Sequence, residues 1–201
     1  MRESIFKRRL VEQARVAKGQ RVLDVGCGTG TLTILLKKAR PEAEVVGVDG
    51  DPKILKIARS KVAEAGLSIA LDHGLSFELP YHDDTFDRVI FSLVLHHLTR
   101  ENKIRSLKEA FRVLRPAGEL HVADLGRPQS TLMRLPSVII RHLEEASDNV
   151  EGLLPTMIRN SGYELVEETA TYMTIFGTLA LYRARKPYSS LLEKQMCKVE
   201  A

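Results

Sequence analysis

One stretch, in which an apolar run breaks into three alternate glycines, constrains the fold of this chain more than any other. Residues 22–25 read Val-Leu-Asp-Val, and Gly26, Gly28 and Gly30 follow. Apolar residues at helical spacing then resume at Leu32, Leu35, Leu36 and Ala39. The pattern predicts a buried strand, a tight turn and a helix. Free N–H groups at the start of such a helix can face a ligand.

The spacing of these glycines indicates the class of ligand. A dinucleotide fingerprint reads G-x-G-x-x-G, but Thr31 occupies its third glycine position and Gly30 comes one residue early. A second apolar run, Val45–Val48, ends at Asp49, where a carboxylate can accept hydrogen bonds from ribose hydroxyls. We therefore predict a ligand that carries adenosine without a pyrophosphate.

These two stretches resemble the class I S-adenosylmethionine (SAM) dependent methyltransferases, in particular the small-molecule, type 11-like group. The resemblance spans roughly residues 20 to 124 and continues, in order, through Leu79–Tyr81, Thr85–Asp87, Leu95–Leu98 and Leu114–Gly118. It implies an enzyme that transfers the methyl group of SAM and releases S-adenosylhomocysteine. The acceptor, which the family does not determine, is expected to be a small molecule.

Strand-like and helix-like segments alternate along the chain, which favours an α/β fold. We expect helices at 3–17, 30–39, 52–65, 101–114 and 150–160, and strands at 20–25, 44–49, 68–72, 86–92, 118–124, 163–171 and 174–184. The resemblance implies a Rossmann-like, doubly wound seven-stranded sheet in the order 3-2-1-4-5-7-6, with the last strand antiparallel. One domain, 1–201, is expected, with an N-terminal helix in 1–18, a possible lid at 126–148 and a C-terminal tail at 188–201.

The resemblance also assigns cofactor contacts, residue by residue. The backbone at Gly26, Cys27 and Gly28 would lie under the methionine and ribose of SAM, and Asp24 would hold the amino group. Asp49 would take the ribose hydroxyls, while Gly50 would allow the ribose to approach. Ile54 would lie on the adenine face, although core packing explains it nearly as well. Two further contacts are expected where strand 86–92 ends, at Ser92 and Leu93.

The adenine edge departs from the family pattern. Relatives usually carry Gly-Asp-Ala before Leu-Pro, whereas this chain has Gly74, Leu75 and Ser76. Leucine cannot accept a hydrogen bond from the adenine amino group, so the backbone, Ser76 or a displaced Asp72 has to substitute. The loss of one such bond costs on the order of 1 kcal/mol.

Two histidines follow strand 86–92 and are the candidate general bases. His96 and His97 are chosen because histidine in general titrates near neutral pH, but a Leu-His-His-Leu segment is often structural in this family. Cys27 occupies a turn that needs a small residue, so packing explains it better than catalysis. The histidines show no spacing typical of zinc motifs, and no metal site is expected.

Composition limits the alternatives. The 201 residues carry a net charge of +4, no tryptophan and 44% hydrophobic residues, which suits one core but makes nucleic acid an unfavoured partner. No apolar run approaches the roughly 20 residues of a membrane span, and two cysteines fit a cytoplasmic location. The oligomeric state stays open.

Three other functions stay open. An RNA or protein methyltransferase is favoured by the basic chain ends, and a non-catalytic SAM-binding protein by Leu75. An NAD-dependent oxidoreductase is opposed by Thr31. Apolar residues at 132–143 suggest that the lid and the helix at 3–17 enclose an apolar acceptor, although core packing explains them equally well.

Overall fold

The computed structural model describes residues 3–127, 146–174 and 177–188. Its helices are α1 (Glu3–Ala14), α2 (Thr31–Ala39), α3 (Pro52–Glu64), the 3₁₀ helix η1 (Leu95–His97), α4 (Arg100–Val113), α6 (Ser147–Val150) and α7 (Leu154–Asn160). Its strands are β1 (Arg21–Val25), β2 (Glu44–Asp49), β3 (Ala70–His73), β4 (Phe86–Ser92), β5 (Leu114–Leu125), β6 (Glu164–Thr174) and β7 (Gly177–Arg185). Most of the predicted lid and of the predicted tail lies outside the described residues.

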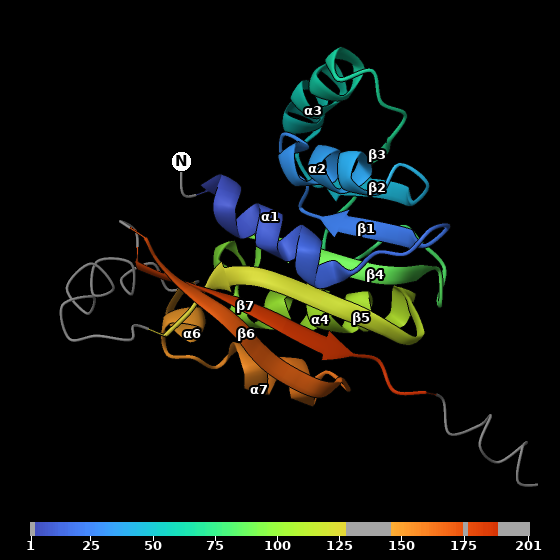
Figure 1. Cartoon of the computed structure of the whole chain (residues 1–201). Helices are drawn as coiled ribbons and strands as arrows, with labels where there is room; N and C mark the ends of the chain where they lie inside the picture. The colour runs from blue at the N-terminus through green and yellow to red at the C-terminus, as the bar shows by residue number, and fades with distance from the viewer. Residues whose placement is uncertain (1–2, 128–145, 175–176, 189–201) are drawn as a thin grey trace, which may run out of the picture.

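The seven strands form one sheet in the order β3-β2-β1-β4-β5-β7-β6, which confirms the predicted order (Figure 1). Strands β1 to β5 are mutually parallel, and β7 runs antiparallel to both β5 and β6. The strand order reverses direction at β1, where the chain crosses from one half of the sheet to the other. Ligands of open α/β sheets bind at such a switch point, beyond the carboxyl ends of the strands.

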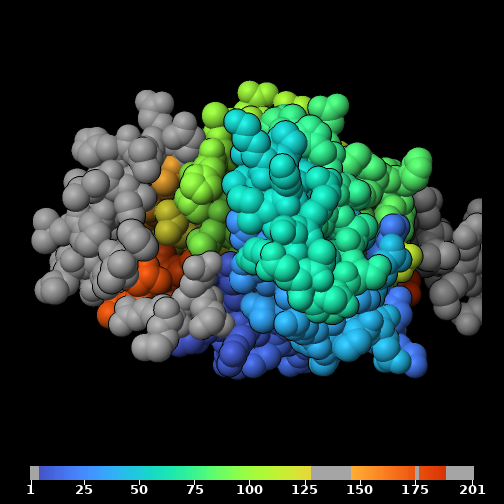
Figure 2. Space-filling view, turned by 90° about the horizontal axis from the view of Figure 1, so that it is seen from above, coloured from blue at the N-terminus to red at the C-terminus, as the bar shows by residue number. Residues whose placement is uncertain are grey.

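Helices cover both faces of the sheet. Helices α1 and α2 pack on one face against residues such as Val22, Val45 and Ile90, while α4 and α7 cover the other face (Figure 1). Seen from above, the cyan and teal residues that include α3 face the viewer beside the blue N-terminal residues (Figure 2). The sheet is thus the middle layer between two helical layers.

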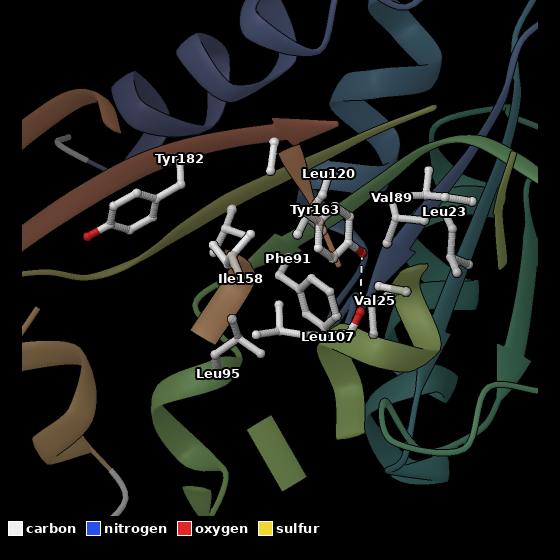
Figure 3. Packing of buried hydrophobic residues seen from close by; sticks show 14 of the residues in the cluster. Leu23, Val25, Val89, Phe91, Leu95, Leu107, Leu120, Ile158, Tyr163 and Tyr182 are labelled. Carbon is white, nitrogen blue, oxygen red and sulfur yellow. Dashed lines mark hydrogen bonds between the residues drawn. The ribbon is translucent and has the colours of Figure 1, made fainter. Parts of the chain in front are cut away.

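The α4 side holds the larger core cluster. Phe91 of β4 lies among Leu95, Leu107 and Ile158, and Tyr163 donates a hydrogen bond of 3.2 Å from its hydroxyl to the Leu107 carbonyl (Figure 3). All four apolar side chains in this group are fully buried. Burial of each contributes about 1.5–3 kcal/mol, so the core holds β4, η1 and α4 as one unit.

Local signals in the sequence explain where several elements begin. Asp51 caps α3 by accepting hydrogen bonds from the N–H groups of Lys53 and Ile54, and Pro52 occupies the first turn. The glycine turn is also confirmed, since Gly26, Gly28 and Gly30 all have positive φ angles. Only glycine adopts this backbone conformation without strain.

Several predicted boundaries were wrong, including those of the last two strands, since β6 extends to Thr174 and β7 begins only at Gly177. The helix predicted at 3–17 ends at Ala14, because Arg15 has a φ of 42° and leaves the helical conformation. The helix predicted at 150–160 begins only at Leu154, where a proline occupies its first turn, and the short α6 precedes it. The strand predicted at 118–124 extends over 114–125, with an irregular register near Ala117, whose φ is 61°.

Two absences concern the described part of the chain alone. No helix there is long and apolar enough to cross a bilayer. No group of three or more His, Cys, Asp or Glu side chains in the same part of the chain could hold a metal ion.

Candidate functional site

A cavity of about 470 Å³ opens beyond the carboxyl ends of β1, β2 and β4. This volume lies within the usual range for small-molecule and cofactor sites. The residues that line it are Gly26, Gly28, Thr29, Asp49, Gly50, Ile54, Gly74, Leu75, Ser76, Phe77, Leu93, Val94, His97 and Leu98. Most of the predicted contact residues line this cavity, which lies at the edge of the sheet where the sequence predicts the site.

The glycine turn forms one wall of this cavity. The N–H groups of Gly26 and Cys27 donate hydrogen bonds of 2.8 and 3.0 Å to the Val48 carbonyl, which joins the turn to β2. A Cβ atom at Gly26 would lie only 2.5 Å from a Val94 methyl group. Since real Cβ atoms do not approach so closely, glycine lets the turn and the segment after β4 meet across the cavity.

Asp49 connects β2 to this turn. One oxygen of its carboxylate accepts a hydrogen bond of 2.8 Å from the N–H group of Gly28, and the other accepts one of 2.9 Å from Asp51. Each carboxylate oxygen has further acceptor capacity. The side chain is thus held at the cavity by backbone donors and can still accept hydrogen bonds from a ligand.

Asp24 lies beneath the turn and does not line the cavity. Its side chain is 1% exposed, and one oxygen accepts a hydrogen bond of 2.6 Å from the Thr33 hydroxyl of α2. The other oxygen, Oδ1, has no hydrogen-bond partner among the described residues. Burial raises the pKa of this carboxyl group from 3.8 to about 7. Asp24 is therefore a buried carboxylate with unused acceptor capacity.

Two more predicted contacts lie behind the wall of the cavity. Cys27 is buried, and burial raises the pKa of its thiol above the ordinary value, so the thiolate is disfavoured. The Cys27 side chain lies against Gly47, where it would contact an added Cβ atom at 3.0 Å, in keeping with a packing role. The Ser92 hydroxyl oxygen is buried without a hydrogen-bond partner in the described structure.

The end of the cavity at β3 is mainly apolar. Ile54, Leu75 and Phe77 line it, and Leu75 remains 44% exposed. The Leu75 side chain lies 3.0 Å from where a Cβ on Gly50 would be, so the two residues meet at the cavity wall. This end of the cavity offers apolar side chains to a ligand instead of the carboxylate that relatives usually carry at the position of Leu75.

The two polar substitutes considered for the missing acceptor differ in position. Ser76 lines the cavity, and its hydroxyl shares a hydrogen bond of 2.8 Å with that of Ser106. Asp72 does not line the cavity, and its carboxylate accepts a hydrogen bond of 2.9 Å from the Tyr81 hydroxyl. Ser76 is therefore the better placed of the two.

The two candidate histidines occupy different environments. His97 lines the cavity, whereas His96 does not and lies with its Nδ1 atom 2.8 Å from the Asp124 carboxylate. Their ring centroids are 3.9 Å apart. Burial lowers the pKa of His97, and the neighbouring His96 lowers it further. His97 is consequently the histidine that can face a ligand with a neutral ring.

Sequence reasoning missed five lining residues: Thr29, Gly74, Phe77, Val94 and Leu98. Each is the immediate sequence neighbour of a predicted contact, so adjacency was the available signal. It also missed Asp124, a fully buried carboxylate at the end of the buried run 120–124 of β5. A charged residue within such a run was itself a signal, because buried charges require partners.

Comparison with known proteins identifies the family. A family described as a methyltransferase domain matches residues 22–118. An uncharacterized methyltransferase of Synechocystis sp. is 31% identical over 186 residues, which cover 91% of this chain and 84% of that protein. The chain belongs to the class I SAM-dependent methyltransferases. SAM is therefore the cofactor of this methyltransferase.

Two further matches define how far the similarity extends. A demethylmenaquinone methyltransferase of Listeria monocytogenes is 37% identical over 125 residues, covering 61% of this chain and 52% of that protein. The chain thus spans about half the length of such curated relatives. A SAM-dependent methyltransferase from Methanosarcina mazei aligns with a TM-score of 0.73 at 19% identity, over 89% of this chain and 98% of that one. At this identity the structural match supports the fold alone.

Proposed function

We propose that this methyltransferase transfers the methyl group of SAM to a small-molecule acceptor at the cavity beyond β1, β2 and β4. One observation carries the proposal. The hydrogen bond of 2.8 Å from the Gly28 N–H group to the Asp49 carboxylate joins the glycine turn and the acidic residue at a single cavity. These features suit a ligand that combines an amino acid and a ribose.

The residues present fit SAM at each of its parts. The glycine turn would hold the methionine part, and Asp49 would accept from the ribose hydroxyls. The buried Oδ1 of Asp24, which has no partner among the described residues, suits the cationic amino group. Ile54 and Leu75 would enclose the adenine ring, with Ser76 as the nearby polar group. Cys27 would contribute through its backbone in the glycine turn, and Ser92 through its position at the end of β4.

The chemical work left to the protein is alignment and exclusion of water. SAM when bound supplies an activated methyl group on a sulfonium, so the protein has to place the acceptor in line with it. Leu93, Val94 and Leu98 provide an apolar wall beside His97. A neutral His97 ring can accept a proton from a hydroxyl acceptor. The His96 ring packs against the His97 ring and would support it.

The acceptor proposed for a first test is demethylmenaquinone. This choice rests on the name of the relatives that are 37% identical over 125 residues. The single-domain organisation, the lid at 126–148 and the cytoplasmic location stay predictions. A lid test would be protection of this segment from hydrogen exchange by SAM.

Incubation with methyl-labelled SAM and a panel of acceptors tests the proposal. The panel contains a demethylmenaquinone analogue, other small hydroxylated and amine compounds, RNA and a protein mixture. We expect label to enter an extractable small molecule, at a rate that Asp49→Ala reduces. Glu42→Ala is the matched control, because Glu42 is an exposed acid that contacts Lys18 instead of the cavity. Label only in RNA or protein would contradict the small-molecule proposal.

A further inference from the structure

The carboxylate of Asp124 holds the backbone around the site from beneath. It lies at the end of β5 and is fully buried. Its Oδ2 atom accepts hydrogen bonds from the N–H groups of Val94, at 3.1 Å, and Leu95, at 2.8 Å. Its Oδ1 atom accepts one of 2.7 Å from Leu125. The carboxylate thereby joins β5 to the segment that follows β4.

Two side chains complete the surroundings of Asp124. Nδ1 of His96 lies 2.8 Å from Oδ1, and the amide of Asn149 donates to the same atom at 3.1 Å. Three backbone N–H groups and this amide all donate to the Asp124 carboxylate, so both of its oxygens act as acceptors. Because a carboxylate without a proton only accepts, Nδ1 of His96 must carry the hydrogen in this bond.

The segment that Asp124 holds, residues 93–98, is a wall of the cavity. Leu93, Val94, His97 and Leu98 all line it. The segment leaves β4 through Leu93, whose φ of 61° is unfavourable for a residue with a side chain. Such a conformation persists only where its surroundings enforce it. The Asp124 hydrogen bonds and the buried Leu95 side chain (Figure 3) provide that enforcement.

We propose that Asp124 is a positioning residue for methyl transfer: it holds His96 as the Nδ1–H tautomer and so keeps the His97 ring at the cavity. The inference rests on the proposed function, because His97 matters only if an acceptor is deprotonated there. His96 transmits the constraint through its ring, whose centroid is 3.9 Å from that of His97. Asp124 itself does not line the cavity and acts through this pair.

Charges on every adjoining element bear on this arrangement. Asp124 is contributed by β5, the buried Lys103 by α4 and Asp148 by α6, and Lys103 lies 3.3 Å from the Asp148 carboxylate. Burial raises the pKa of Tyr182 of β7, and the Glu168 and Asp124 carboxylates raise it further. Burial lowers the pKa of His97, the neighbouring His96 lowers it further, and the Asp124 carboxylate opposes this shift.

Nitrogen NMR of the full chain with ¹⁵N-labelled histidine tests the tautomer directly. Wild type should show His96 with its proton on Nδ1, although free imidazole favours Nε2. Asp124→Asn can present an amide N–H to His96, so the proton should move to Nε2. Asp148→Asn is the matched control, since Asp148 is also buried but contacts Arg100 and Lys103. That variant should leave the His96 tautomer unchanged.

Two results would overturn the inference. One is a wild-type His96 protonated on Nε2, which needs no variant to fold. The other is a folded Asp124→Asn protein with an unchanged tautomer. These results are independent of SAM, so they are distinguishable from a wild type that binds no SAM, which contradicts the proposed function instead.

Kinetics then separate positioning from mere structure. Asp124→Asn should reduce kcat by about 10- to 100-fold, as expected for a displaced catalytic group, while the dissociation constant of SAM changes little. The pH profile of kcat should also shift, because the charge beside the histidine pair changes. A loss that follows SAM binding alone, with an unchanged pH profile, would show that Asp124 is only structural.

Discussion

The carboxyl ends of β1 and β5 each carry a buried carboxylate, Asp24 and Asp124, but the two differ in how many hydrogen bonds they accept. Asp124 at the end of β5 accepts five hydrogen bonds. Asp24 accepts one, from Thr33, and has an oxygen without a partner in the described structure. A buried carboxylate with every acceptor site in use stabilises the fold. One with unused capacity is suited to a ligand, at a cost to stability.

The largest expected difference between Asp124 and Asp24 is in how much each contributes to the free energy of unfolding. Asp124→Ala leaves the N–H groups of Val94 and Leu95 and the Asn149 amide without an acceptor, so the free energy of unfolding should fall by about 3–5 kcal/mol. Asp24→Asn keeps the shape of the side chain and removes a poorly solvated charge, and should cost far less. Urea unfolding measures both. Equal losses of unfolding free energy would mean that the two carboxylates do not differ in their contribution to stability.

The second difference should be in pH dependence. The pKa of Asp24 is 3.8 ordinarily and about 7 in the fold, so between these values the folded state binds more protons than the unfolded state. Stability from this group is therefore lost as the pH rises from about 4 to about 7, by up to about 4 kcal/mol. The stability difference between Asp24→Asn and wild type should grow over this window. A constant difference would mean that Asp24 is ionised throughout.

A smaller effect is expected at the neighbouring strand end, where Asp49 faces the ligand directly. Asp49→Ala should weaken SAM binding by about 1–3 kcal/mol, the range for charge-assisted hydrogen bonds. Calorimetry with SAM measures the change, and Glu42→Ala is the control. Unchanged affinity in a folded variant would mean that the ribose is held elsewhere.

The smallest effect concerns the apolar end of the cavity at β3. Leu75→Asp should restore an acceptor for the adenine amino group and tighten SAM binding by on the order of 1 kcal/mol. Titration of both proteins with SAM measures this change. Weaker binding by a folded variant would show that Leu75 packs on adenine and that another group, such as Ser76, already holds the amino group.

The sequence predicted most of the fold because its signals are local. The apolar run before Gly26 predicted β1, and the helix predicted at 52–65 begins where Asp51 caps it and Pro52 occupies its first turn. The end of α1 was missed because apolar spacing continues to Ala17, although Arg15 has already left the helix. No local pattern records that conformation.

The candidate site was predictable only where one motif carries it. Gly26, Gly28 and Asp49 line the cavity as expected, since the glycines lie in the turn that follows β1 and Asp49 is the last residue of β2. The division of roles between His96 and His97 depends on Asp124, which lies 28 residues away along the chain. Such a long-range hydrogen bond leaves no trace in residue spacing.

Calorimetric titration of the full chain with SAM and, separately, with NADH tests most directly whether the cavity binds SAM. We expect saturable binding of SAM at one site, reduced in Asp49→Ala, and no binding of NADH. Binding of NADH without binding of SAM would contradict this expectation, because the glycine turn and Asp49 would then serve a dinucleotide.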